Sequence, residues 1–146
     1  MTSRPLRGAV GQTLTFPGAR EFPDGTRTAQ DAAAAIGCSV GQIVKSLVFV
    51  RGDEPVLVLC SGANTVDAER LGLAKADADV VRRATGFAIG GVPPVGHRTK
   101  PIVLIEERLM AFAEIWAAAG TPNAVFRLTP ADLVELTGGR VAAVAR

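Results

Sequence analysis

The chain has 146 residues, of which 48% are hydrophobic and 21% charged, and its formal net charge at pH 7 is +2. This length suits one globular domain that needs no metal or disulfide bond for its core, and the small charge argues against a general polyanion-binding surface. Two scattered cysteines, Cys38 and Cys60, and one histidine do not have zinc-site spacing. We therefore expect no metal, no cofactor, no membrane-spanning or secretory segment, and a reducing, cytoplasmic location.

The N-terminal part of the chain predicts an extension followed by a helix. Residues 1–25 are rich in Gly, Pro, Arg and Thr and predict a poorly defined extension, in which Thr13–Phe16 alternates like a short edge strand. The alanines between Thr28 and Ile36 indicate a helix, with Thr28 as its N-cap and Gly37 at its end. A further helical turn is expected around Val40–Ile43.

An apolar hairpin follows, and it is the clearest in the sequence. Val44–Val50 and Val56–Cys60 are nearly continuous apolar runs, which predicts a sheet covered on both faces. Lys45 lies at the entry to the first run. Its side chain points either into a pocket at the start of the strand or to solvent on an edge strand, and the pattern alone favours the exposed position.

The second half of the chain alternates short helices and strands. The run Glu106–Ala119 is ambiguous, because a single turn at Glu106–Met110 and one amphipathic helix over the whole run both fit its composition. The other expected elements are helices over Thr65–Leu71, over Asp77–Thr85 and from Thr129 to Gly138, and strands over Ile102–Ile105, Ala124–Leu128 and Val141–Val144.

A loop rich in glycine and proline, Gly86–His97, connects the Asp77–Thr85 helix to the Ile102 strand. Its four glycines and two prolines in twelve residues exclude a regular helix or a central strand. The loop is either a ligand cradle with inward N–H groups or only a tight connection. The sequence has no Ser-His-Asp arrangement, nucleophile elbow or phosphate-binding loop, so Lys45, this loop and His97 could bind an anionic or carbonyl-bearing ligand without an obvious protein nucleophile.

Two motifs carry a family resemblance. Ile43–Phe49 (Ile-Val-Lys-Ser-Leu-Val-Phe), followed by Gly90–His97 (Gly-Gly-Val-Pro-Pro-Val-Gly-His), resembles the YbaK/EbsC family, the stand-alone relatives of the editing domain inserted in bacterial prolyl-tRNA synthetases. The resemblance implies a single α/β domain over residues 1–146, with a mixed, largely antiparallel sheet flanked by helices and a strand near Phe112–Ala119. It also implies hydrolysis, in trans, of the ester that joins a wrong amino acid to tRNA-Pro or a related tRNA.

The resemblance implies roles for particular residues. The lysine at the position of Lys45 is the family's hallmark active-site residue, and the Gly-x-x-x-Pro loop beside it is Gly90–Pro94 here. Lys45 would neutralise the terminal phosphate or polarise the ester carbonyl, while N–H groups of Gly90 and Gly91 stabilise the oxyanion. Water or a thiol of the substrate would attack the ester. The implied substrate contacts are Ser46, Ser61, Pro94 and His97.

Several alternatives stay open at this point. His97 is either a proton shuttle or a hydrogen-bonded loop histidine, and Ser46 and Ser61 are either polar pocket contacts or plain packing. The expected partners are the 3′ end of a mischarged tRNA and an aminoacyl-tRNA synthetase that lends affinity, with no membrane, and the expected state is a monomer or weak homodimer. A non-catalytic module that docks on tRNA or a synthetase, and a hydrolase of another small ester, are the alternative functions. The family's N-terminal helix is not recognisable before Thr28, so the amino acid that the pocket admits is open.

Overall fold

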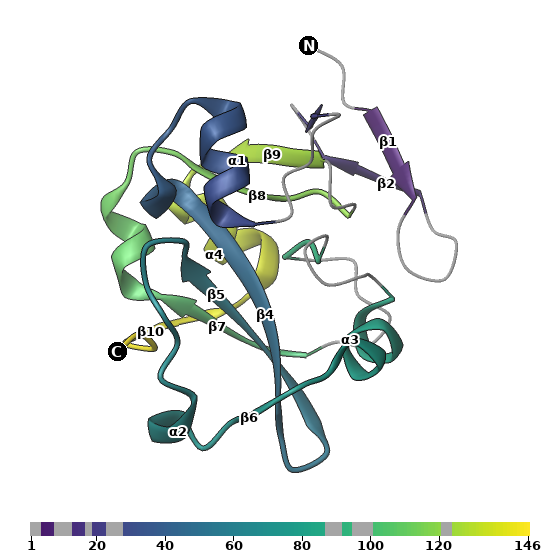
Figure 1. The fold of residues 1–146 in the computed structure, drawn as a ribbon, viewed down its shortest axis with the longest axis vertical. Coiled ribbons are helices and arrows are strands. Elements are labelled where there is room, and N and C mark those ends of the chain that lie inside the picture. Colours follow the sequence, from purple (N-terminus) through teal and green to yellow (C-terminus); the bar gives the residue numbers. More distant parts are fainter. Residues whose placement is uncertain are drawn as a thin grey trace.

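The computed structural model describes residues 4–7, 13–16, 19–22, 28–86, 92–94, 101–120 and 124–146. Within them a central mixed sheet of eight strands carries helices on both faces (Figure 1), which confirms the expected α/β architecture. The strand order is β10-β7-β5-β4-β8-β9-β3, with β6 beside β4. The strands of this sheet are β3 (Arg20–Glu21), β4 (Ile43–Arg51), β5 (Glu54–Ser61), β6 (Ala74–Lys75), β7 (Ile102–Glu106), β8 (Ile115–Ala118), β9 (Ala124–Leu128) and β10 (Arg140–Ala142).

The predicted hairpin, β4 and β5, is the centre of the sheet. Its register runs from Val44 opposite Ser61 to Arg51 opposite Glu54, and Gly52 takes the positive φ of 62° that the two-residue turn requires. Successive side chains of β5 alternate between the two faces, yet all six from Val56 to Ser61 are buried. The near-continuous apolar run is therefore explained by a sheet that is covered on both sides.

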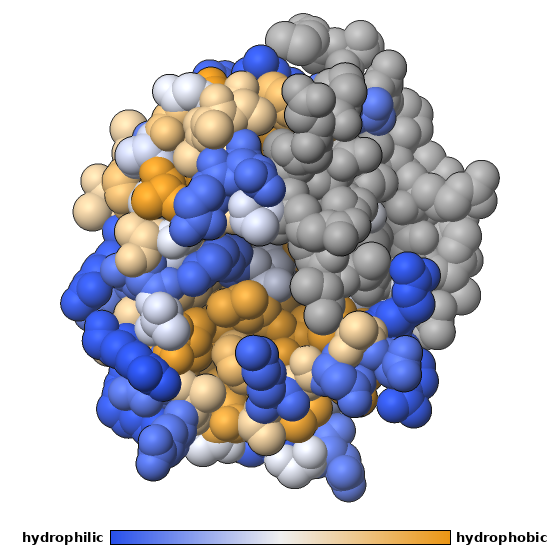
Figure 2. Space-filling model, viewed as in Figure 1, coloured by the Kyte–Doolittle hydropathy of each residue, from blue (hydrophilic) through white to orange (hydrophobic). Residues whose placement is uncertain are grey.

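Helices on the two faces bury separate groups of side chains. α3 (Ala78–Thr85) and α4 (Pro130–Thr137) contribute Val81 and Leu133 to the large core on one face. On the other face α1 (Ala29–Ile36) packs its small alanines against Ile43 and Trp116, and α2 (Ala68–Leu71) covers a third cluster near β6. Figure 2 shows apolar side chains gathered in the lower half of the view, where β4 and β6 lie in Figure 1.

The helix ends follow the sequence signals. Thr28, Asp77 and Thr129 each accept a hydrogen bond from the N–H three residues further on, and Gly37, Gly86 and Gly138 end α1, α3 and α4 with positive φ. These caps satisfy backbone groups that a helix end otherwise leaves unpaired. The predicted helical turn after α1 is the 3-10 helix η2 (Val40–Gln42). None of the helices described is long and apolar enough to cross a bilayer.

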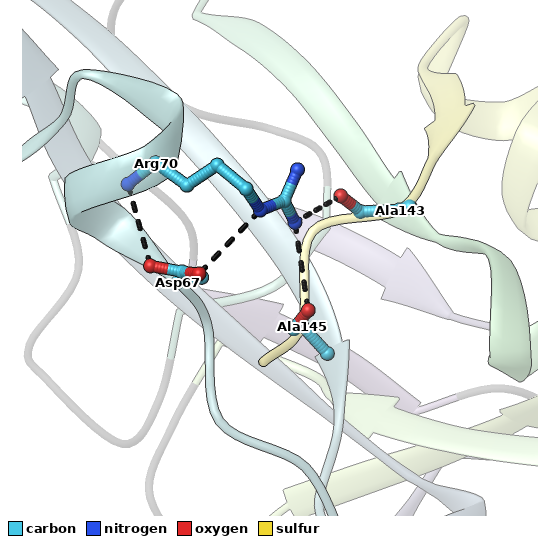
Figure 3. Close-up of polar contacts among 4 residues, drawn as sticks. All are labelled: Asp67, Arg70, Ala143 and Ala145. Carbon is cyan, nitrogen blue, oxygen red and sulfur yellow. Dashed lines mark hydrogen bonds and ion pairs between the residues drawn. The ribbon is translucent and has the colours of Figure 1, made fainter.

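The helix expected over Thr65–Leu71 is shorter than predicted, because its first residues belong to a β-bridge. Val66 pairs with Ala145, so α2 begins only at Ala68, with Asp67 as its cap. Arg70 then fastens the C-terminal segment: its guanidinium donates to the backbone oxygens of Ala143 (2.6 Å) and Ala145 (3.5 Å) and pairs with Asp67 (Figure 3). The bridge is a long-range contact that local sequence does not encode.

Strands β8 and β10 are set by pairing with distant strands rather than by local sequence. The run after β7 forms the 3-10 helix η3 (Glu107–Ala111) and then strand β8, as the family pattern predicted and against the helical propensity of its alanines. The last strand is Arg140–Ala142 rather than Val141–Val144, because β10 pairs in parallel with Leu104–Glu106 of β7. A separate hairpin, β1 (Arg4–Arg7) and β2 (Thr13–Phe16), contains the strand predicted at Thr13.

Candidate functional site

The site begins at a gap in the sheet along one edge of β4. Gly62 donates to the carbonyl of Ile43 (2.7 Å), so the odd-numbered residues of β4 bond to β5 and the even-numbered ones direct their backbone groups to the opposite edge. On that edge β8 pairs only with Ile43 and Val44, and β6 only with Phe49 and Val50. Among the described strands, none pairs with the backbone of Ser46 on this side.

A cavity of about 310 Å³ occupies this gap. It lies between β4, β8 and the N-terminal end of α1, and its walls are mostly apolar. Lys45 is the one charged side chain among the described lining residues, and none of those residues is Asp, Glu, His or Cys. The lining residues are Thr28, Ala29, Gln30, Ala32, Ile43, Val44, Lys45, Ser46, Leu47, Gly62, Val92, Trp116, Ala117, Ala118 and Val125.

Lys45 belongs to a row of polar residues that crosses three strands. It pairs with Cys60 on β5, and because Leu59 pairs with Ile105, the next residues Cys60 and Glu106 also lie side by side. All three side chains therefore share one face of the sheet. The Lys45 ammonium donates to the backbone carbonyl of Asn64, in the loop that follows β5.

Glu106, at the end of β7, is fully buried and surrounded by hydrogen-bond donors. Its carboxylate accepts from the Ser61 N–H (2.9 Å), from the Asn64 side-chain amide (2.8 and 3.2 Å) and from the Cys60 thiol (3.5 Å). A buried carboxylate requires such donors, because burial removes the hydrogen bonds that it would make to water. Asn64 thus contacts Glu106 with its side chain and Lys45 with its backbone.

The Cys60 thiol is a donor in this network rather than a nucleophile. Burial, together with the neighbouring Glu106 charge and the hydrogen bond to it, raises the pKa of Cys60 to about 12, and the positive charge of Lys45 opposes that rise. The thiol therefore stays protonated at neutral pH, where only a thiolate would be reactive. No three His, Cys, Asp or Glu side chains in the described part of the chain gather closely enough to hold a metal ion.

Two polar atoms beside the cavity lack a partner among the described residues. They are the hydroxyl of Ser46 and the indole N–H of Trp116, and both atoms are buried. Trp116 is 7% exposed. The Arg20 guanidinium makes cation–π contacts with the Trp116 indole ring, at 5.8 Å, and with the Phe22 ring, at 5.1 Å. Because buried polar groups are nearly always paired, such atoms beside a cavity indicate capacity for a polar ligand.

The structure brings some of the predicted site residues together. Lys45 and Ser46 line the cavity. Ser61 is not among the lining residues, although the next residue, Gly62, is. Its hydroxyl donates to the Gly41 carbonyl (2.7 Å), a contact within the protein. Pro94 is buried outside the described cavity lining. The remaining predicted residues, Gly90, Gly91 and His97, lie outside the described residues.

Sequence reasoning missed Asn64, Glu106, Gly62 and Trp116. The alternation of β7 would place Glu106 on the face opposite Ile105, but only the register with β5 reveals Cys60 and Lys45 as its neighbours. Gly62 is explained only by the structure. A Cβ there would lie 2.5 Å from the Val40 carbonyl oxygen, so a residue other than glycine cannot occupy this wall without movement.

Comparison with known proteins assigns the chain to a family. The family model of the aminoacyl-tRNA editing domain matches residues 23–136, and the chain belongs to this family. An uncharacterised protein of Bacillus subtilis (strain 168), YwhH, is 31% identical over 128 residues, which cover 83% of this chain and 82% of that protein. A proline–tRNA ligase of Geobacter sp. (strain M21) is 35% identical over 89 residues, covering 56% of this chain but 16% of the ligase.

Solved structures show the same fold. The structure of a candidate trans-editing enzyme for prolyl tRNA synthetase superposes with a TM-score of 0.82 at 51% identity, covering 88% of this chain and 85% of that one. A hypothetical protein, APE2540, gives a TM-score of 0.79 at 30% identity over 88% of this chain and 90% of that chain. The family assignment therefore rests on sequence and on fold.

Proposed function

We propose that this protein hydrolyses, in trans, the ester of a mischarged tRNA, with tRNA-Pro as the first candidate, and that the aminoacyl group enters the cavity between β4 and β8. The single observation that carries this proposal is the position of Lys45, the only charged residue among the described cavity walls. Membership in the aminoacyl-tRNA editing family and the similarity to a candidate trans-editing enzyme for prolyl tRNA synthetase support the reaction class and the choice of tRNA.

The role proposed for Lys45 is that of a fixed cation. An ammonium group has three N–H donors, and the Asn64 carbonyl takes one of them. No hydrogen bond of the other two is seen among the described residues, and we propose that they contact the ester carbonyl or the terminal phosphate of the tRNA. The Ser46 hydroxyl and its N–H, on the open edge of β4, are the next polar contacts for the carbonyl.

The size and chemistry of the cavity support a small substrate group. About 310 Å³ is at the lower end of the range for small-molecule sites, which suits an aminoacyl group better than a whole nucleotide. The described walls carry no carboxylate or imidazole to act as a general base. We propose that water, positioned by a hydroxyl of the tRNA itself, or a thiol of the substrate attacks the ester carbonyl. In either case the bond to the ribose oxygen breaks, and the 3′ end of the tRNA leaves as a free hydroxyl after taking up the proton of the nucleophile.

A panel of mischarged tRNAs tests the proposal. Ala-, Cys- and Ser-tRNA-Pro are incubated with wild type, Lys45→Ala and Lys75→Ala, and ester loss is followed under single-turnover conditions. Lys75 lies on β6, exposed and outside the cavity, and is the matched control. We expect hydrolysis of at least one substrate, a fall of about 100-fold in Lys45→Ala and no change in Lys75→Ala.

Two outcomes of the panel contradict the proposal. If wild type hydrolyses no substrate, the enzymatic function is wrong and the alternative of a non-catalytic docking module takes its place. If wild type is active and Lys45→Ala is equally active, the role given to Lys45 is wrong although the reaction class stands.

A further inference from the structure

We propose that Glu106 is a positioning residue for the reaction: through Asn64, its buried carboxylate fixes the place of the Lys45 ammonium. The inference rests on the proposed function for its kinetic readout, but it also has a readout that needs no substrate. It starts from the fact that Glu106 is fully buried, yet does not line the cavity. A buried carboxylate without contact to the cavity requires a structural reason.

The first step is the state of the carboxylate. Every hydrogen bond that it makes to a described residue is to a donor: a backbone N–H, a side-chain amide and a thiol. A protonated carboxyl group would need an acceptor for its own proton, and none is found among its described partners. The contacts therefore suit a buried anion on the same face of the sheet as Lys45.

The second step is the link through Asn64. Its side-chain amide donates to both oxygens of Glu106, while its backbone carbonyl accepts from Lys45. The Ser61 N–H, three residues earlier, is held by the same carboxylate, and Asn64 N–H donates back to the Ser61 carbonyl (3.0 Å). The short loop that carries the Lys45 acceptor is thus fastened at both ends to one anion.

The third step is the geometry of the row. Lys45 and Glu106 are two strands apart, with the small Cys60 side chain between them. Because adjacent strands are about 4.8 Å apart, the lysine can reach across the cysteine toward the Asn64 loop. Without the anion the long side chain would have several rotamers open to it, and a catalytic group that is loosely held loses rate.

A double-mutant cycle tests this inference. Single-turnover rate constants are measured for wild type, Glu106→Gln, Lys45→Ala and the double variant, with the concentration of the excess enzyme varied to separate the maximal rate constant from KM. Glu107→Gln, which removes the exposed neighbouring carboxylate, is the matched control. Gln keeps an acceptor for the Ser61 N–H and removes the charge, so the fold is expected to persist.

We expect Glu106→Gln to lower the maximal rate about tenfold with little change in KM, and to have no effect in the Lys45→Ala background, as for residues that act as a unit. Glu107→Gln should match wild type. Equal rate losses from Glu106→Gln in both backgrounds would overturn the inference, because a purely structural residue adds its effect to that of Lys45→Ala.

Lysine reactivity supplies the readout that needs no activity. The chain has three lysines, Lys45, Lys75 and Lys100, so reductive methylation followed by peptide mass spectrometry resolves each site. We expect Lys45 to react about tenfold more slowly than Lys75 in wild type. In Glu106→Gln the ratio of the two rates should approach one, because Asn64 no longer fixes the Lys45 ammonium. An unchanged ratio in the folded variant would overturn the inference.

Two outcomes are separated by this design. An inactive wild type with a changed lysine ratio sinks the proposed function and retains the positioning of Lys45. If Glu106→Gln does not fold, Asn64→Ala takes its place in both measurements, because it keeps the carbonyl that accepts from Lys45 but removes the amide that anchors it. Wild-type rates and ratios in a folded Asn64→Ala would then contradict the inference.

Discussion

The two sides of β4 at Lys45 differ in how completely their polar groups are paired. Toward β5 and β7, Cys60, Asn64 and Glu106 form a hydrogen-bonded network with the lysine. Toward β8, the strand edge is open and the described structure gives the Ser46 hydroxyl no partner. The first region has the paired polar groups of an ordinary protein interior, and the second has the unpaired polar groups of an unoccupied binding site.

This difference suggests a division of labour. A satisfied buried network is rigid, because each member would lose its partners by moving. An apolar cavity with a few unpaired polar atoms is typical of a ligand-binding site. We infer that the paired side fixes the cation and that the open side receives the aminoacyl group. Substitutions that remove the network on the paired side should therefore lower stability, whereas those on the open side should lower activity and leave stability unchanged.

The largest effect is expected on the paired side. Glu106→Ala leaves the Ser61 N–H, the Asn64 amide and the Cys60 thiol without their acceptor. We expect it to lower the free energy of unfolding by about 3 kcal/mol, measured by urea denaturation. Glu107→Ala, at an exposed position, should stay within about 0.5 kcal/mol of wild type. Equal losses in the two variants would show that the network contributes nothing.

The wall between the two sides should tolerate little added volume. A Cβ at Gly62 would lie 2.5 Å from the Val40 carbonyl oxygen and 2.8 Å from the Ala29 Cβ. We expect Gly62→Ala to destabilise the protein by about 2 kcal/mol and to slow deacylation. Gly52→Asn is the control, because nothing lies within 4 Å of its Cβ position and Asn accepts positive φ. A wild-type unfolding curve for Gly62→Ala would contradict the close packing of this wall.

On the open side, stability and activity should separate. Ser46→Ala removes a polar atom that has no partner in the described structure. We expect it to leave the free energy of unfolding within about 0.5 kcal/mol of wild type and to slow deacylation about tenfold. Parallel measurement of urea unfolding and single-turnover rate checks both. A large stability loss with an unchanged rate would reverse the roles given to the two sides.

The smallest effect is a pH dependence from Cys60. Its folded pKa of about 12 is above the ordinary value of 9.0, so the unfolded chain releases the proton first and stability falls as pH rises above 9. Between pH 8 and pH 10 wild type should lose about 1 kcal/mol more than Cys60→Ala. Urea unfolding at both pH values measures the difference. Parallel losses would mean that the thiol titrates normally in the folded state.

Local signals in the sequence were sufficient for the elements that depend on local interactions. The helices α1, α3 and α4 follow from an N-cap residue and a terminal glycine, and the β4–β5 hairpin from two apolar runs around a turn. Strand β8 could not be found this way, because its alanines favour a helix and only pairing with β4 and β9 makes it a strand.

The site itself was only partly predictable. Lys45 was ambiguous by pattern, and the family motif identified it as the active-site candidate. Glu106 and Asn64 gave no local signal. The neighbours of Glu106 depend on the register between β5 and β7, which are distant in sequence. Asn64 contacts Lys45 with its backbone carbonyl, which every residue has. The open edge at Ser46 likewise depends on where β8 and β6 stop pairing with β4, which is a property of the whole sheet.

The central claim is that the aminoacyl end of the tRNA binds in the gap between β4 and β8, and Trp116 tests it most directly. It is the single tryptophan of the chain and lines the cavity. Its fluorescence is titrated with an aminoacyl-adenosine analogue in which an amide replaces the ester, while calorimetry measures binding independently. We predict a saturable change in emission with a Kd that matches calorimetry and rises about tenfold in Ser46→Ala. Calorimetric binding without any change in Trp116 emission, and with an unchanged Kd in Ser46→Ala, would contradict the claim.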